Sequence, residues 1–268
     1  PFEKKPVKIQ HPLNEEMNHL RNSILISLLN TAGKNIRRKY DNINIFEVGK
    51  IFYRNGKNIE EINSFAILLS GINRKQQWNE KEIEYDFYDI KGIAEQFFAM
   101  KKIDEIKFEN KDIPGYYNKA QSLSVFLNEK KIAVFGKLSD ETTKVFEIKN
   151  NIFCFEMLVE DSMNLVNGFK LNNLSKYPKV IKDISVLLDI SEESITIKNV
   201  IQKYGGKYLQ NTETIDLYQG KQIESNKKSY TFRMEFQSMD KTLADKEIDK
   251  IFNKIINGLK KDLKVEIR

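Results

Sequence analysis

Side chains suited to binding single-stranded RNA recur in the last third of the sequence, at positions that alternate along predicted strands. RNA recognition uses an aromatic ring on which a base stacks, cations for the phosphates, and amides or hydroxyls for base edges. The sequence supplies all three kinds at Tyr218, Arg233, Gln237, Lys264 and Arg268. These residues predict an RNA-binding surface, provided that the chain places them on one face.

Three consecutive elements near the C-terminus would position most of these residues. In 229–237 every second side chain is apolar or aromatic and those between are polar, which is typical of a half-buried strand. In 248–263 apolar residues recur every three or four positions and predict an amphipathic helix. Residues 264–268 alternate again and predict a closing strand that carries Lys264 and Arg268.

The segment just upstream predicts a matching half. Residues 183–189 form an apolar strand, and 197–204 form a short helix that is capped by Ser194 or Thr196 and stopped at Gly205-Gly206. Residues 214–218 form another strand. The order βαββαβ predicts a ferredoxin-like fold, in which two helices cover one face of a sheet and the other face is free. The alternation places on this free face Ser185, Leu187, Asp216, Tyr218, Thr231, Arg233, Glu235, Gln237, Lys264 and Arg268.

The first part of the chain predicts an α+β domain built around an antiparallel sheet. A strand that begins at Ile43 leads into an Asn55-Gly56 hairpin turn, and a helix opens near Asp86. Another helix, capped by Asn14, is expected to end near Gly33. Further strands are expected at 65–70, 123–127, 132–137 and 153–158. The polar segment 171–178 predicts the boundary, so the two domains would cover 1–172 and 174–268.

The composition favours a folded cytoplasmic protein. The 268 residues are 40% hydrophobic and 31% charged, with the charges interspersed. No apolar run reaches the roughly 18 residues of a membrane span, and no signal peptide is recognisable. Cys154, the only cysteine, fits a reducing compartment and is expected to be a buried packing residue. Because the first residue is Pro1 rather than Met, we expect a fragment of a longer chain.

The positive charge is concentrated in the second predicted domain. From Leu174 onward the sequence has 18 Lys and Arg against 14 Asp and Glu, within a net charge of +6 for the whole chain. A mildly basic module suggests a polyanionic partner. A solvated, lysine-rich surface with no such partner explains the same numbers.

Two other pairs of residues could do chemistry but have simpler explanations. His11 and His19 lack a third histidine or cysteine nearby, so we expect no zinc site. Asp86 and Asp89 could form a metal or acid–base pair. At the start of a helix we expect them to act as a cap and a charge that the helix dipole favours.

Five segments carry a resemblance that covers nearly the whole chain. They read HPLNEEM at 11–17 with LRNSIL at 20–25, IFEVGKIF at 45–52, DFYDIKG at 86–92, SKYP at 175–178 with KDI at 182–184, and FQSMDKTL at 236–243. In this order the segments are similar to motifs of the bacterial phenylalanyl-tRNA synthetase β subunit. The resemblance implies a catalytically silent class II synthetase-like domain followed by a ferredoxin-fold anticodon-binding domain.

The resemblance also implies partners and a reaction. In that family the β chain docks the catalytic α subunit in an (αβ)₂ assembly that attaches phenylalanine to tRNA(Phe) with ATP and Mg²⁺. The family's editing domain would lie upstream. We expect no catalytic residue, metal site or cofactor in this chain, because the arginines and glycine-rich strand of an adenylation site are missing. Lys182 and Lys241 stand where the family has arginines, and we add them to the RNA-binding candidates.

The sequence departs from the family in two further places. Asn118–Leu123 stands where the family has a loop with His, Pro and Gly, and Ala244 replaces a frequent capping threonine, which leaves Asp245 as the possible cap. Two alternative functions stay open. One is a structural scaffold that never contacts RNA. The other is a regulatory domain for a small ligand, which would need a glycine-lined pocket that the sequence lacks. If the free face binds tRNA, Arg233→Ala, Tyr218→Ala and Lys264→Ala should each weaken binding by about 1 kcal/mol or more.

Overall fold

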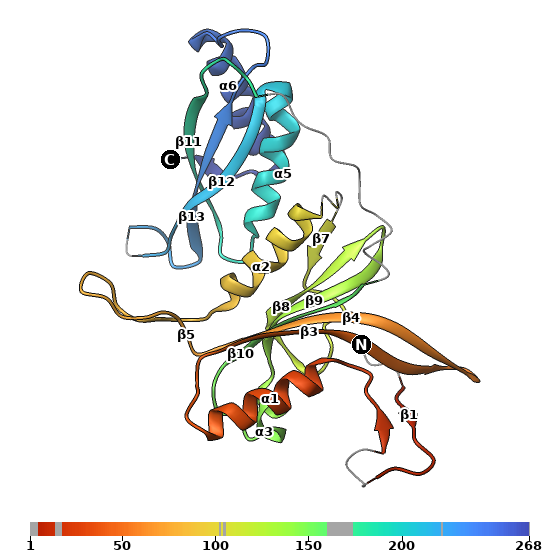
Figure 1. Cartoon of the computed structure of the whole chain (residues 1–268). Coiled ribbons are helices and arrows are strands. Elements are labelled where there is room, and N and C mark those ends of the chain that lie inside the picture. The colour runs from red at the N-terminus through yellow and green to blue at the C-terminus, as the bar shows by residue number, and fades with distance from the viewer. Residues whose placement is uncertain are drawn as a thin grey trace. The chain divides into compact units, whose positions relative to one another are not determined.

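The computed structural model describes residues 5–13, 18–101, 103, 106–159, 174–220 and 222–267 (Figure 1). Contacts within the chain divide it into two compact units, Pro1–Phe169 and Lys170–Arg268. We call them unit 1 and unit 2. Each contains its own sheet and its own hydrophobic core, and we describe each separately.

Unit 1 is built on a six-stranded sheet in which every neighbouring pair is antiparallel, in the order β3-β4-β10-β9-β8-β7. The bounds are β3 Ile43–Asn55, β4 Asn58–Ser70, β7 Ile106–Glu109, β8 Tyr117–Leu127, β9 Lys130–Leu138 and β10 Ile152–Leu158. Two-stranded pairs lie beside it, formed by β1 Val7–Lys8 with β2 His19–Leu20 and by β5 Ile72–Arg74 with β6 Ile83–Glu84. The predicted α+β class and the Asn55-Gly56 hairpin are confirmed.

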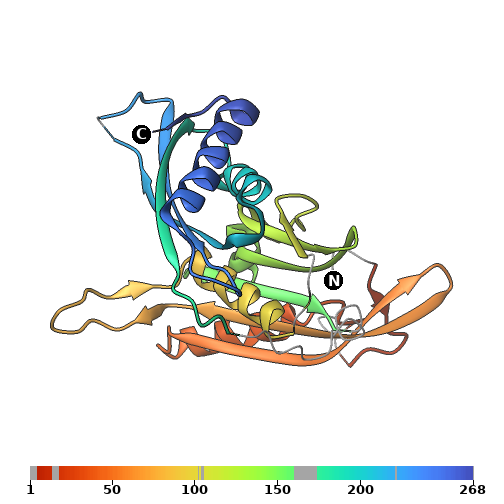
Figure 2. The same cartoon turned by 90° about the horizontal axis from the view of Figure 1, so that it is seen from above.

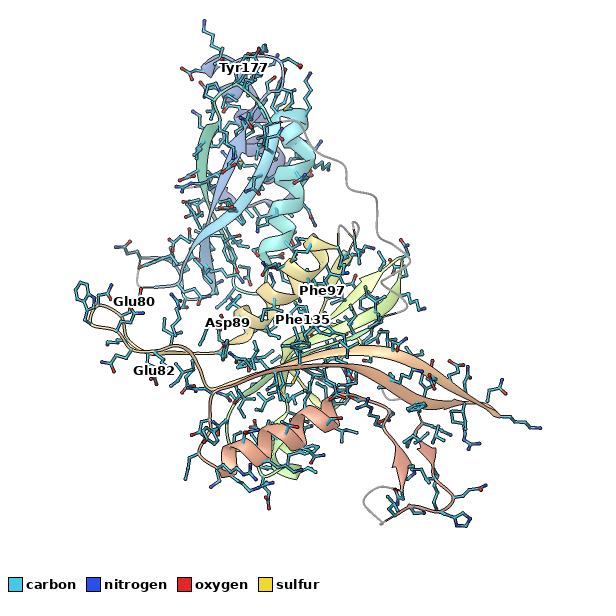
Figure 3. All side chains as sticks on the ribbon, in the orientation of Figure 1. Glu80, Glu82, Asp89, Phe97, Phe135 and Tyr177 are labelled. Carbon is cyan, nitrogen blue, oxygen red and sulfur yellow. The ribbon has the colours of Figure 1, made fainter. Side chains whose placement is uncertain are left out.

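Helices pack on both faces of this sheet. Alternate residues of the fully buried strand β10 contact the helix α1 (Leu25–Arg37) on one face and the helix α2 (Phe87–Met100) on the other. Cys154 lies on the α1 side and is fully buried, as predicted. Phe97 and Phe135, labelled in Figure 3, belong to the aromatic layer between α2 and the sheet. A short helix, α3 (Asp140–Val145), follows β9.

The helix α2 begins with a reciprocal cap formed by two carboxylates. Asp86 Oδ1 accepts hydrogen bonds from the backbone N–H groups of Tyr88 (2.7 Å) and Asp89 (3.2 Å), and Asp89 Oδ2 accepts one from Asp86 N–H (2.8 Å). This geometry satisfies helical N–H groups that have no partner within the helix. The prediction of a cap rather than a catalytic pair is confirmed.

Two expectations for unit 1 were wrong. The helix expected from Asn14 to Gly33 runs from Leu25 to Arg37, and Leu20 lies in β2 instead; Asn14 itself lies outside the described residues. The helix continues through Gly33 because that residue packs against the backbone of Phe146, where a Cβ atom would come within 2.8 Å of the carbonyl oxygen. The segment Asn118–Leu123 is part of the strand β8, with a register shift, and not a loop.

Unit 2 has a four-stranded antiparallel sheet in the order β12-β13-β11-β14, with two helices on one face (Figure 2). Its elements follow one another as β11 Val180–Asp189, α5 Ser194–Gly205, β12 Leu209–Tyr218, β13 Lys227–Phe236, α6 Asp245–Leu263 and β14 Glu266–Ile267, with a short 3-10 turn η2 (Gly206–Tyr208) before β12. The inward side chains Phe232, Met234 and Phe236 are fully buried against the helices. The predicted ferredoxin-like βαββαβ order is confirmed.

The helix caps of unit 2 differ from the prediction. The N-cap of α5 is Glu193, whose side chain makes no capping bond, rather than Ser194 or Thr196. The N-cap of α6 is Ala244, and Glu247 Oε2 accepts a hydrogen bond from its backbone N–H at 3.2 Å. This is one of the two hydrogen bonds of a capping box, and it forms although the cap residue has no hydroxyl. Asp245 is the first helical residue and not the cap. The Gly205-Gly206 stop is confirmed, with Gly206 at a φ of 65°.

Candidate nucleic-acid interface

Unit 2 leaves one face of its sheet without a covering helix, and we call this surface the open face. The strand registers align its side chains in rows, such as Glu213, Arg233 and Asp183. The outward side chains of the four strands are Ile181, Asp183, Ser185, Leu187, Asp189, Asn211, Glu213, Asp216, Tyr218, Lys227, Ser229, Thr231, Arg233, Glu235 and Glu266.

Tyr218 is the aromatic side chain of the open face. It ends β12 opposite Ser229 and is half-buried. Its ring lies against Gly220, where an added Cβ atom would come within 2.6 Å of the phenol oxygen and 2.8 Å of Cζ. The missing side chain at Gly220 therefore gives the ring its position. A partly exposed ring at a strand end can stack with a base.

Arg233 lies on the open face, as predicted, but it already has a partner. Its Nε and Nη2 atoms donate hydrogen bonds to the two carboxylate oxygens of Asp183, at 2.9 and 2.8 Å. This two-point bond, together with the charge of Arg233, holds the pKa of Asp183 below its ordinary value. Sequence reasoning missed this pair, because spacing along the chain does not show which residues of two strands lie opposite each other.

The open face is acidic overall. It carries six carboxylates against two cations, namely Asp183, Asp189, Glu213, Asp216, Glu235 and Glu266 against Lys227 and Arg233. Lys179, beside the sheet, pairs with Glu235 at 2.6 Å. This surface is poorly suited to phosphates. Its carboxylates and hydroxyls, including the Ser185–Thr231 pair at 2.9 Å, suit the amino groups of base edges better.

Three other predicted site residues lie off the open face and have local partners. Lys182 points to the helix side of β11, where its Nζ atom lies 3.2 Å from the carboxylate of Asp249 in α6. Lys241 pairs with Glu247 at 2.5 Å, and this bond raises the pKa of Lys241.

Gln237 follows β13 and donates a hydrogen bond through Nε2 to the carbonyl oxygen of Tyr177 at 2.7 Å, which ties down the segment before β11. Tyr177 is labelled in Figure 3. The amide of Gln237 is thus already used within the protein.

Lys264 does not belong to the sheet, and its predicted place on the open face was wrong. The helix α6 runs to Leu263, and Lys264 is its C-cap, with a left-handed φ of 52°. The chain needs this residue to reverse direction, so the closing strand starts only at Glu266. Lys264 is exposed to solvent at the end of α6. Arg268 lies outside the described residues.

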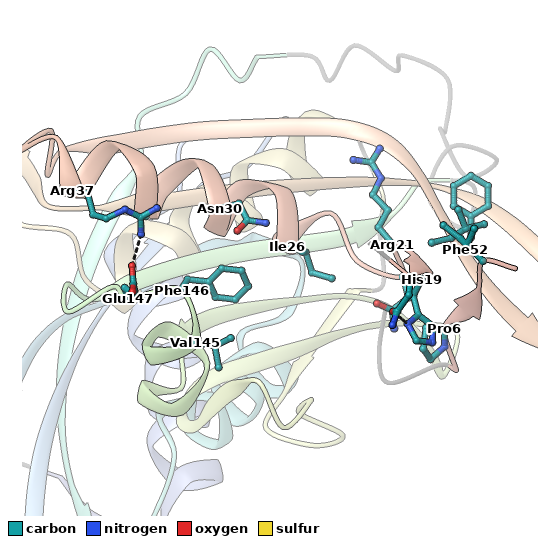
Figure 4. Close-up of a pocket in the computed structure, with 15 residues that line it drawn as sticks. Pro6, His19, Arg21, Ile26, Asn30, Arg37, Phe52, Val145, Phe146 and Glu147 are labelled. Atoms are coloured by element: carbon teal, nitrogen blue, oxygen red, sulfur yellow. Dashed lines mark hydrogen bonds and ion pairs between the residues drawn. The ribbon is translucent and has the colours of Figure 1, made fainter. Parts of the chain in front are cut away.

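A groove of about 1160 Å³ lies in unit 1 between α1, α3 and the β1–β2 pair (Figure 4). Its charged side chains are satisfied within the protein. Arg21 bonds Glu47, and Arg37 bonds Glu147 at 2.8 Å. We therefore assign no chemistry to this groove.

Among the described residues, no three His, Cys, Asp or Glu side chains come close enough together to hold a metal ion. Within the same residues, no helix combines the length and the apolar character needed to cross a membrane.

A buried carboxylate lies on the α1 side of the unit 1 sheet. Glu156 in β10 is fully buried and accepts hydrogen bonds from Ser23 Oγ (2.5 Å) and the Tyr116 hydroxyl (3.0 Å), and its carboxylate is also bonded by the backbone of Ile24, the N-cap of α1. Burial raises the pKa of Glu156 in spite of these bonds. The N-cap Ile24 makes no side-chain capping bond, and Ser23 Oγ accepts a hydrogen bond from the Leu25 N–H at 3.1 Å, so Ser23 and Glu156 together serve the N-terminus of α1.

An exposed apolar strip lies on the other face of the same sheet. Phe46 and Val48 of β3 are 71% and 61% exposed, next to Phe65 and Ile67 of β4. The strand β3 is at the edge of the sheet, where α2 packs instead on β9 and β10. Exposed apolar side chains in a contiguous strip are typical of surfaces that another protein covers.

These features define a two-unit protein in which an antiparallel α+β unit is followed by a ferredoxin-like module. Residues 2–159 match the family model described as the phenylalanyl tRNA synthetase beta chain CLM domain, and residues 175–268 match the ferredoxin-fold anticodon binding domain. The chain belongs to the phenylalanyl-tRNA synthetase β-chain family.

Relatives match over nearly the full chain. The phenylalanine–tRNA ligase β subunit of Carboxydothermus hydrogenoformans is 31% identical over 98% of this chain and 33% of its own length. The phenylalanine–tRNA ligase β subunit of Syntrophus aciditrophicus is 28% identical over 96% of this chain and 32% of its own length. The chain thus spans about a third of the length of these relatives. Among solved structures, pyrrolysyl-tRNA synthetase from Desulfitobacterium hafniense has a TM-score of 0.43 at 13% identity, over 59% of this chain and 52% of that one.

Proposed function

We propose that this chain is the C-terminal part of a phenylalanine–tRNA ligase β subunit, in which residues 174–268 bind the anticodon stem-loop of tRNA(Phe) and residues 1–172 dock the catalytic α subunit. The two family models in tandem over nearly the whole chain carry this proposal. The complete ligase would be an (αβ)₂ assembly in the cytoplasm that charges tRNA(Phe) with ATP and Mg²⁺.

The geometry of the open face supports base recognition at Tyr218. The ring is positioned by Gly220 at the end of β12 and has a polar neighbourhood, with Asp216 two residues earlier on the same face. Stacking is worth about 1–3 kcal/mol per base and tolerates any base. The carboxylate of Asp216 adds an acceptor that discriminates between bases.

The test is binding of the full chain to a fluorescent anticodon stem-loop of tRNA(Phe) and to one of an unrelated tRNA, over a salt series. We expect a preference for tRNA(Phe), and Tyr218→Ala should weaken binding about tenfold. Tyr40→Ala is the matched control, because Tyr40 is 65% exposed in unit 1. Equal binding of both RNAs, or no difference between the two variants, would contradict anticodon recognition by the open face.

Docking of the α subunit is supported by the apolar strip at Phe46 and Val48. Replacing Phe46 with serine should reduce co-purification of a co-expressed α subunit, because a buried aromatic anchor contributes more than most interface residues. Trp78→Ser is the control, since Trp78 is 96% exposed away from the strip. Retained co-purification of the Phe46 variant would place the interface elsewhere.

A scaffold function without RNA contact is the second candidate, and the acidity of the open face favours it. Six carboxylates repel phosphates, and Arg233 is engaged by Asp183. This candidate predicts α-subunit binding in the absence of any RNA binding. The salt series above separates the two functions.

A further inference from the structure

The outer face of α6 carries a run of cations that the predicted site did not include as a group. Six lysines on and just after α6 are exposed to solvent, at positions 246, 250, 254, 260, 261 and 264. At 3.6 residues per turn the five lysines within α6 fall within a sector of about 120° around the helix, opposite the buried stripe of Ile248, Ile255 and Leu259, and Lys264 follows as the C-cap. Along the axis they extend over about 27 Å. We call them the lysine stripe.

No acidic side chain of α6 lies within this sector. The carboxylates of the helix are at Asp245, Glu247, Asp249 and Asp262. The last three are bonded to lysines outside the helix, as Glu247 with Lys241, Asp249 with Lys182 and Asp262 with Lys203. Among the described residues, no ion pair involves a lysine of the stripe. The two other residues in the sector, Asn253 and Asn257, are neutral hydrogen-bond donors and acceptors.

The stripe and the open face therefore have opposite charge. The open face carries six carboxylates and two cations, whereas the stripe carries six cations and no carboxylate. They lie on different sides of unit 2, because α6 packs its buried side on the inward face of the sheet. A surface of like charges about 27 Å long attracts a polyanion of comparable length and releases its counterions.

We propose that the lysine stripe of α6 is a second nucleic-acid contact, which binds the sugar-phosphate backbone of RNA independently of base sequence. Charge complementarity selects a polyanion, and the proposed function of unit 2 as a tRNA-binding module, on which this inference rests, selects RNA among polyanions. The open face then reads bases, and the stripe supplies the phosphate contacts that the open face lacks. Asn253 and Asn257 add donors for phosphate oxygens or ribose hydroxyls.

The test replaces three cations of the stripe by neutral side chains in the full chain, as Lys250→Gln, Lys254→Gln and Lys261→Gln. Glutamine is a good helix former, so α6 should fold as before, which circular dichroism checks. The control variant carries Lys57→Gln, Lys75→Gln and Lys81→Gln, which remove the same charge from exposed positions of unit 1.

The readout is affinity for intact tRNA(Phe) and an unrelated tRNA at several salt concentrations. The affinity of the stripe variant should be about tenfold or more below that of the wild type for both RNAs alike. The slope of log affinity against log salt concentration should fall in magnitude by about 2. The control variant should change little. Unchanged affinity and slope in the stripe variant would overturn the inference.

The outcomes separate this inference from the proposed function. If Tyr218→Ala weakens binding and the stripe variant does not, anticodon binding stands and the stripe inference fails. If the stripe variant weakens binding of both RNAs while Tyr218→Ala has no effect, the stripe inference stands and anticodon binding by the open face fails. A final arm uses vesicles that contain phosphatidylserine. Stripe-dependent binding to these vesicles without RNA binding, or no binding to either, overturns the inference.

Discussion

Arg233 and Asp183 lie opposite each other on neighbouring strands of unit 2 and are joined by two parallel hydrogen bonds of 2.9 and 2.8 Å. The pair is half exposed, with 43% and 39% of the two side chains accessible. Its contribution to stability is therefore modest. Its main consequence is electrostatic, because it neutralises the central cation of the open face.

Removing the carboxylate should free this cation. We expect Asp183→Asn to raise the affinity for the anticodon stem-loop severalfold and to steepen its salt dependence, because Arg233 becomes available to phosphate. Combining it with Arg233→Ala should abolish the gain. Asp240→Asn is the control, since Asp240 is an exposed acid outside the sheet. A gain in affinity of the same size in the control would show that the change in net charge alone explains the effect.

The pH dependence of the pair has a definite sign. The pKa of Asp183 is lowered by its hydrogen bonds to Arg233, so the stabilisation is present above the ordinary aspartate pKa of about 3.9 and is lost as pH falls through the lowered value. The difference in stability between the wild type and Asp183→Asn should thus be constant from pH 6 to 8 and shrink below about pH 4. Thermal melts at these pH values measure it.

The periodicity of single elements predicted most of unit 2, and its failures occurred where two elements meet. Alternation in β13 correctly separated the buried Phe232 from the exposed Arg233. It could not show that Asp183 lies opposite Arg233, because the register between β11 and β13 follows from packing rather than from sequence spacing. Lys264 was misplaced for a related reason, since the helical stripe does not reveal at which residue the helix ends.

In unit 1 the local signals likewise predicted more than the long-range ones. The Asp86–Asp89 cap and the Asn55-Gly56 turn follow from residues close in sequence, and both were predicted. The start of α1 was not predicted. Its N-terminus is bonded by Glu156, which lies more than a hundred positions away on a strand whose other residues are apolar core.

Gly220 should control the position of the Tyr218 ring. A Cβ atom at residue 220 would lie 2.6 Å from the phenol oxygen, so Gly220→Ala should displace the ring while the domain stays folded. We expect RNA affinity to fall by nearly as much as in Tyr218→Ala, with a melting temperature close to that of the wild type. Gly56→Ala is the control for a glycine change with no neighbour within 4 Å, although its φ of 60° adds strain of its own. Unchanged affinity in Gly220→Ala would show that the ring position does not matter for binding.

Asp86 should matter for stability and not for RNA binding. Asp86→Ala removes the acceptor for two N–H groups at the start of α2, which should cost about 1 kcal/mol in the free energy of unfolding of unit 1. Unfolding of unit 1 exposes the buried thiol of Cys154. The extent of maleimide labelling in short pulses at increasing urea concentration therefore measures the free energy of unfolding. Asp86→Ser should recover most of the loss, because serine is also a good cap. A loss of RNA affinity in the alanine variant would point to a functional carboxylate instead.

Glu156 should make the stability of unit 1 depend on pH in the opposite sense to Asp183. Burial raises its pKa, so its contribution is fully present below the ordinary glutamate value of about 4.3 and is lost as pH rises through the raised value. Glu156→Gln cannot ionise and keeps acceptors for Ser23 and Ile24. We therefore expect the wild type to lose stability relative to Glu156→Gln as the pH rises above the ordinary glutamate pKa.

Pulsed labelling of Cys154 at each pH compares the two proteins under identical thiol chemistry, since both carry the same buried cysteine. Glu156→Ala provides the contrast. It leaves the donors around the site without an acceptor and opens a cavity, so it should be less stable than Glu156→Gln by about 3 kcal/mol at every pH. Parallel stability curves for the wild type and Glu156→Gln would mean that Glu156 keeps the same protonation state in the folded and unfolded chain, and the raised pKa would be wrong.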